Sequence, residues 1–79
     1  MIRTPDDLTD KQWGCVLAVR KNWRLDGTGP TLSILSAMMG IRGIGAVTHV
    51  LRCKALGYLT STPHKARSLR LTDKARKAL

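Results

Sequence analysis

The stretch GIRGIGAVTHVLRCKALGYL, residues 40–59, decides the fold of this chain. Gly40 follows an apolar run and suits the position just after a helix end. From position 44 to position 56 apolar residues recur at helical spacing, which predicts a helix whose apolar stripe holds Ile44, Val47, Val50, Leu51 and Ala55. Gly57 is expected to end this helix, and residues 58–60 have the composition of a strand.

The arc of this helix opposite its apolar stripe is small and polar. It carries Gly45, Thr48 and Arg52, with His49 nearer the edge of the stripe. Glycine lets a backbone approach another surface closely, and short polar side chains on one helical arc fit the major groove of DNA. An ordinary core helix with a solvated face explains the same pattern, so the rest of the chain has to decide between the two.

The charge of the chain is strongly basic and unevenly distributed. Fourteen basic residues against five acidic ones give a net charge of +9. Residues 1–40 hold five basic and four acidic residues, whereas residues 41–79 hold nine basic residues and Asp73 alone. Such a bias indicates a polyanionic partner, of which nucleic acid is the commonest. A basic but merely solvated surface is the alternative.

Two further helices are expected before this stretch, after a flexible arm at residues 1–7. Thr9 and Gln12 form a capping box that opens a helix running to about Leu25. The core stripe of this helix consists of Cys15, Val16, Val19 and Trp23. A turn at residues 26–30 contains two glycines and a proline, and Thr31 then caps a short apolar helix at residues 32–39.

A hairpin and a short helix are expected after Gly57. Residues 68–71 alternate, with Leu69 and Leu71 on the buried face and Ser68 and Arg70 outward. A basic, proline-containing loop joins this strand to residues 58–61, and Thr72 caps a last helix at residues 73–79. The order helix, turn, helix, helix, hairpin, helix predicts one α+β, mostly α domain at residues 8–79. It is the order of a winged helix-turn-helix with a three-helix core, a β-hairpin wing and a short C-terminal helix.

Four short segments mark the ends of these elements. They are Leu8-Thr9-Asp10-Lys11-Gln12, Gly27-Thr28-Gly29-Pro30-Thr31, Gly40-Ile41-Arg42 and Gly57-Tyr58-Leu59. In this order and spacing they resemble the DNA-binding domain of LexA-type repressors. The ending LTDKARKAL, residues 71–79, is similar instead to the strand-to-helix ending of MarR-type regulators. The third helix is one residue shorter than in the LexA family and differs in residue type, so the operator of that family is not carried over.

The resemblance implies a sequence-specific regulator of transcription that binds double-stranded DNA. It places base contacts on the third helix and backbone contacts on the wing. The candidate DNA-binding residues are Arg42, Gly45, Thr48, His49, Arg52, Lys65, Arg67 and Arg70. For His49 a packing role within the helix remains open. We expect a homodimer, because one small winged helix binds a single half-site weakly, and the size favours a stand-alone regulator of the phage or plasmid type.

Other classes of protein fit the chain less well. Cys15 and Cys53 lack the spacing of a metal site and are expected to be buried thiols in the cytoplasm, where the protein would associate with the nucleoid. No catalytic constellation, cofactor motif, small-molecule site, signal peptide or membrane span is expected. The second hypothesis is a protein–protein interaction module. It rests on apolar residues outside the minimal core, namely Trp13, Leu17, Leu32, Ile34 and Met38.

Overall fold

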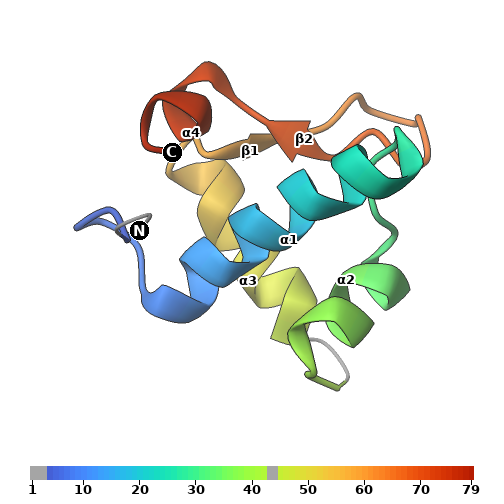
Figure 1. Ribbon diagram of the computed structural model, residues 1–79, viewed down its shortest axis with the longest axis horizontal. Helices are drawn as coiled ribbons and strands as arrows, with labels where there is room; N and C mark the ends of the chain where they lie inside the picture. Colours follow the sequence, from blue (N-terminus) through green and yellow to red (C-terminus); the bar gives the residue numbers. More distant parts are fainter. Residues whose placement is uncertain (1–3, 43–44) are drawn as a thin grey trace.

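Helices dominate the part of the chain that the structure describes, which is residues 4–42 and 45–79 of a computed structural model (Figure 1). In chain order the elements are α1 (Asp10–Asp26), α2 (Leu32–Met39), α3 (Gly45–Ala55), β1 (Leu59–Thr60), β2 (Arg70–Leu71) and α4 (Asp73–Lys77). Helix α1 crosses the middle of the molecule, with α2 on one side and the hairpin on the other, while α3 passes behind α1 and ends near β1. The architecture is α+β and mostly helical, as the sequence predicted.

Local capping interactions fix the ends of the first two helices. The Thr9 hydroxyl accepts a hydrogen bond from the Gln12 amide at 3.2 Å, and the Gln12 side chain accepts one from the Thr9 amide at 3.0 Å. The capping box is therefore confirmed. Thr31 caps α2 in the same way, and Gly40 ends it in the left-handed region at φ 67°. The structure confirms the predicted bounds of this second helix. The bonds that fix its ends join residues close in sequence, which is why a short stretch of sequence could predict them.

The core lies between α1 and the elements on both of its sides. Its largest fully buried side chains come from α1, α2 and α3, and they are Cys15, Val16, Val19, Leu35 and Cys53. Leu35 and Val50 are buried as expected, and both cysteines are free, buried thiols. The Cys53 thiol donates to the Gln12 carbonyl at 3.4 Å, and its contact with Cys15, together with burial, raises the pKa of the Cys15 thiol. Both thiols therefore serve as packing groups.

The predicted apolar stripe of α3 is wrong in part. Ala46, Val50 and Cys53 face the core, whereas Leu51 is 61% exposed and Ala55 is exposed as well. The reason is the small size of Ala46 and Cys53, the two buried residues that flank Val50. They let α3 approach α1 closely, and in that orientation of the helix Leu51 points outward. The expected position of Ile44 in the stripe, and that of Gly43 before it, lie outside the described residues.

The hairpin is short, and hydrogen bonds within it hold its loop in place. Strands β1 and β2 pair antiparallel, with Leu59 opposite Leu71 and Thr60 opposite Arg70. Leu69 and Leu71 are buried as predicted, but Ser68 is buried too, where an outward side chain was expected. Its hydroxyl accepts from the Thr62 amide at 2.9 Å and donates to the Lys65 carbonyl at 2.8 Å. These bonds compensate the burial of a polar group and hold the loop against its own strand.

The segment before α1 is attached to the far end of the chain. The Tyr58 hydroxyl donates to the Asp7 carboxylate at 2.6 Å, and the Lys74 ammonium lies 3.4 Å from the same carboxylate. This ammonium also stands 4.5 Å from the centre of the Tyr58 ring. The Tyr58 hydrogen bond and Lys74 lower the pKa of Asp7, and the same carboxylate raises the pKa of Tyr58 to about 12. Asp7 thus joins the start of α1 to the hairpin and α4.

Candidate nucleic-acid interface

The outward arc of α3 is formed by Thr48, Leu51, Arg52 and Ala55, all of which are exposed. They are exposed because the opposite side of the helix, with Ala46, Val50 and Cys53, faces the core. An α-helix of 11 residues is roughly 16 Å long. The arc is narrow and bears one long polar side chain, a branched apolar one and two small ones.

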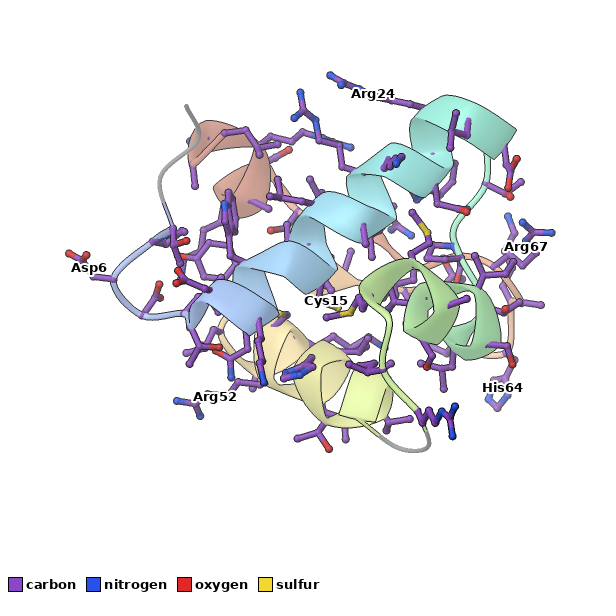
Figure 2. All side chains as sticks on the ribbon, turned by 60° about the horizontal axis from the view of Figure 1, so that its bottom comes forward. Asp6, Cys15, Arg24, Arg52, His64 and Arg67 are labelled. Atoms are coloured by element: carbon purple, nitrogen blue, oxygen red, sulfur yellow. The ribbon has the colours of Figure 1, made fainter. Side chains whose placement is uncertain are left out.

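Arg52 is the most projecting member of this arc. Figure 2 shows its side chain pointing away from the molecule at the lower edge of the view. Among the described residues its guanidinium has no hydrogen bond or ion pair. Five N–H donors in a planar fork are therefore available at the surface of the helix. Such a fork matches the two acceptors of a guanine edge or a pair of phosphate oxygens.

His49 does not belong to the outward arc. It is half-buried and borders a hollow of about 290 Å³ between α1, α2 and the start of α3, with Lys11, Gly14 and Met39 among its neighbours. Of the two roles that the sequence left open, this position favours packing. The lining of the hollow is mostly aliphatic, so the imidazole meets hydrocarbon more than solvent.

Two candidate residues lie at the beginning of α3. Gly45 opens the helix and packs against Ile41, so that a Cβ at this position would stand 3.2 Å from the Ile41 Cδ1 atom. A side chain at this position would therefore require the Ile41 side chain to move by a few tenths of an ångström. Arg42 is exposed just before the helix. It is placed beside the N-terminal end of α3, where backbone amides attract anions.

The basic residues of the hairpin differ in what their side chains contact. The Arg67 Nε–H donates to the Gly29 carbonyl at 3.2 Å, and its Nη2 lies 3.7 Å from the Asp26 carboxylate. Arg70 donates through Nη1 to the Thr62 hydroxyl at 3.3 Å and to the Ser68 carbonyl at 3.4 Å. Lys65 is exposed, and no described residue pairs with its ammonium. Lys65 thus keeps its charge for an outside partner, while Arg67 and Arg70 also fasten the loop.

A backbone clamp holds this loop on the turn between α1 and α2. The Gly29 amide donates to the Arg67 carbonyl at 2.9 Å, and the Trp23 indole N–H donates to the Leu69 carbonyl at 2.7 Å. A Cβ on Gly29 would lie 2.5 Å from the Leu69 oxygen and 2.7 Å from the Arg67 oxygen. Only glycine permits this approach, because the two backbones are nearly in contact.

Ion pairing leaves most of the positive charge uncompensated. Among the described residues the ion pairs are Asp26–Arg67, Asp7–Lys74 and Asp73–Arg76. All three are solvent-exposed, and such pairs contribute about 0–1 kcal/mol each. Figure 2 places Arg52 and His64 along the lower side of the view, at its two ends, with Arg67 higher up beside the turn.

Leu51 is the residue of this surface that the sequence interpretation missed. A leucine at helical spacing from Val47 and Ala55 resembles a core residue. The exposure of Leu51 could have been predicted from two small residues, one four positions before Val50 and the other three positions after it. If Ala46 and Cys53 are taken as the buried neighbours of Val50, Leu51 falls on the opposite arc. Leu51 thus adds one apolar group to a mostly polar helix face.

A search against protein-family models found no match, and no curated protein is significantly similar in sequence. Within residues 4–42 and 45–79 there is no helix with the length and apolar character needed to cross a bilayer. In the same ranges no three His, Cys, Asp or Glu side chains are grouped so that they could hold a metal ion.

Proposed function

We propose that the protein is a sequence-specific regulator of transcription that binds double-stranded DNA as a winged helix-turn-helix of the LexA-like kind. In this proposal α3 enters the major groove and the hairpin loop lies against the DNA backbone or in the minor groove. The observation that supports it most is the outward arc of α3, a narrow surface whose arginine is unpaired among the described residues. The hairpin loop adds the exposed, likewise unpaired Lys65. The proposal includes no catalytic activity, and it places the protein at DNA in the cytoplasm.

The residues of the arc suit contacts with base edges. The Arg52 fork matches the O6 and N7 acceptors of guanine, the commonest specific contact in the major groove. Leu51 and Ala55 offer apolar surface of the kind that contacts the methyl group of thymine. Thr48 is exposed on the same arc and suits either a thymine methyl or a phosphate. The arc therefore favours a site that contains both G·C and A·T pairs.

The phosphate contacts are assigned to residues outside the arc. Arg42 and Lys65 are exposed and unpaired among the described residues, so their charge is available to phosphate oxygens. Arg67 and Arg70 are assigned a mixed role, since their bonds to Gly29, Thr62 and Ser68 keep the loop in place. Each retains N–H donors that can reach a phosphate at the same time.

The proposal is tested by selecting bound sequences from a pool of random duplexes. An enriched palindrome supports both sequence-specific binding and a homodimer, because half-site symmetry mirrors the two-fold symmetry of the protein. Failure to enrich any sequence contradicts the proposal. Sedimentation showing a monomer at high concentration, together with a one-to-one complex on the selected site, contradicts the homodimer alone.

The contact of Leu51 with thymine is tested by removing single methyl groups. Replacing a selected thymine by deoxyuridine deletes only the C5 methyl, and it should weaken binding of the natural protein. The Leu51→Ala variant should lose this sensitivity, because the apolar partner of the methyl is gone. Leu25→Ala, which shortens an exposed leucine on α1 outside the arc, serves as the control. Equal sensitivity of the natural protein and Leu51→Ala at every thymine contradicts the assignment.

The alternative function is a protein–protein interaction module. It is favoured by exposed apolar side chains, of which Leu25 is 70%, Leu51 61% and Leu32 47% exposed. Trp13 no longer supports it, because that side chain is only 3% exposed and meets the Tyr58 ring edge-on. Titrating a random duplex at several salt concentrations separates the two functions. A DNA-binding protein loses affinity steeply with salt, whereas an interaction module binds little DNA at any salt.

A further inference from the structure

A hollow of about 330 Å³ lies between the end of α1, strand β2 and helix α4. It is lined by Arg20, Trp23, Arg24, Arg70, Leu71 and Arg76. Four of these six side chains carry a permanent positive charge. Figure 2 shows Arg24 extending from the upper edge of the view, while Arg52 extends from the lower edge. The hollow therefore lies away from the outward arc of α3.

The inner part of the hollow is apolar and fixed in place. Leu71 is buried, and the Trp23 indole is held by its hydrogen bond to the Leu69 carbonyl at 2.7 Å. Because the N–H of Trp23 is already used, the indole presents only its ring to whatever occupies the hollow. An aromatic or otherwise apolar group is the partner that such a surface accepts.

The arginines around the hollow are poorly compensated. Neither Arg20 nor Arg24 has a hydrogen bond or ion pair to another described side chain. They stand four residues apart on one face of α1, where like charges destabilise a helix by about 0.2–0.5 kcal/mol. Arg76 pairs with Asp73 at 3.3 Å, but the Asp73 side chain is 89% exposed and screened by solvent. A bound anion would relieve this repulsion.

We infer that this hollow binds an organic phosphate, that is, a phosphate monoester whose remaining part is flat and apolar. A phosphate carries about two charges and several oxygens, which suits several guanidinium forks better than a single carboxylate does. The volume lies at the lower end of the range for small-molecule sites and exceeds what a phosphate group alone would fill. The Trp23 ring and Leu71 then contact the apolar part. This site is separate from α3, although Arg70 also belongs to the hairpin that is proposed to contact DNA.

The test is an NMR titration that follows the indole N–H signal of Trp23, with phenyl phosphate as the probe. The buried Trp13 indole serves as the internal reference. We expect the Trp23 signal to shift and saturate with a dissociation constant on the order of 1 mM or lower. Inorganic phosphate lacks the aromatic ring and phenol lacks the phosphate, so each should bind several-fold more weakly than phenyl phosphate.

Substitutions distinguish a built site from general positive charge. Arg24→Gln and Arg20→Gln should each weaken phenyl phosphate binding about tenfold, the cost of losing one charge-assisted bond. Lys21→Gln removes the same charge from an exposed neighbouring position on α1 and should leave binding nearly unchanged. Thermal unfolding of all three variants verifies that each one remains folded.

Three results would overturn the inference. They are the absence of a saturable shift, equal affinity for inorganic and phenyl phosphate, and equal loss in Lys21→Gln and Arg24→Gln. A fourth comes from a duplex oligonucleotide. If the arginine substitutions weaken duplex binding as much as they weaken phenyl phosphate binding, the hollow is part of a DNA surface instead. Because α3 lies elsewhere, failure of the phosphate site leaves the selection experiment for DNA unaffected, and the reverse also holds.

Discussion

Replacing Gly29 by alanine should unfold the junction between the hairpin and the turn after α1. The new Cβ would stand 2.5 Å from the Leu69 oxygen, 2.7 Å from the Arg67 oxygen and 2.8 Å from the Leu69 nitrogen. All three are backbone atoms, so no side chain can rotate away to make room. The loop has to move off the turn.

The magnitude follows from the bonds that this movement breaks. Three hydrogen bonds cross the junction, from the Gly29 amide, the Arg67 Nε–H and the Trp23 indole. Each contributes about 0.5–1.5 kcal/mol, and alanine recovers about 0.4–1 kcal/mol by restricting the unfolded chain. The net loss should be about 0.5–4 kcal/mol of unfolding free energy. For a chain of this size that lowers the thermal midpoint by roughly 3–25 °C.

The assay is thermal and urea unfolding followed by far-ultraviolet circular dichroism, and Gly14→Ala is the matched control. Gly14 lies inside α1, and nothing stands within 4 Å of an added Cβ. That variant should gain about 0.5–1 kcal/mol from helix propensity. If Gly29→Ala is as stable as the natural protein, the loop does not rest on the turn. The reasoning about the clamp, including the role of Arg67 in it, would then be refuted.

Three further predictions concern a buried hydroxyl, the response to pH and the division of labour on DNA. The Thr28 hydroxyl is buried without a partner among the described residues, so Thr28→Val should raise the unfolding free energy by about 1 kcal/mol, while Thr28→Ser, which keeps the hydroxyl, should not. Asp7 has a lowered pKa, so its contribution to stability is present above the unfolded value of 3.8 and should be lost as acid protonates it below that pH. Tyr58 has a pKa raised to about 12 from 10, so stability should also fall as the pH rises from 10 to 12, and Tyr58→Phe should abolish that alkaline loss. On DNA, Arg52→Ala should cost about 1–3 kcal/mol on the selected site and much less on random duplex. Lys65→Ala should weaken binding to the selected site and to random duplex alike, and should lower the slope of log K against log salt by about one. If instead Lys65→Ala removed sequence discrimination and Arg52→Ala weakened both DNAs equally, the hairpin and not α3 would contact the bases.

The sequence by itself determined the ends of the helices. Thr9, Thr31 and Thr72 cap helices, and Gly27, Gly40 and Gly57 end them in the left-handed region. These features depend on hydrogen bonds between residues three or four positions apart, so a short window of sequence contains both partners. The buried face of α1 was predicted only in part. Cys15, Val16 and Val19 are buried as expected, but Trp13 is buried where Trp23 was expected, and Trp23 is half-buried.

Tertiary structure decided how the elements turn toward one another and which charges remain available. The rotation of α3 that exposes Leu51 depends on how closely Ala46 and Cys53 let it approach α1. The attachment of Arg67 to Gly29 joins residues 38 positions apart, and that of Tyr58 to Asp7 joins residues 51 apart. The arginines of the phosphate hollow come from three elements. None of these contacts leaves a periodic trace in the sequence, because each depends on the distance between elements after the core has packed.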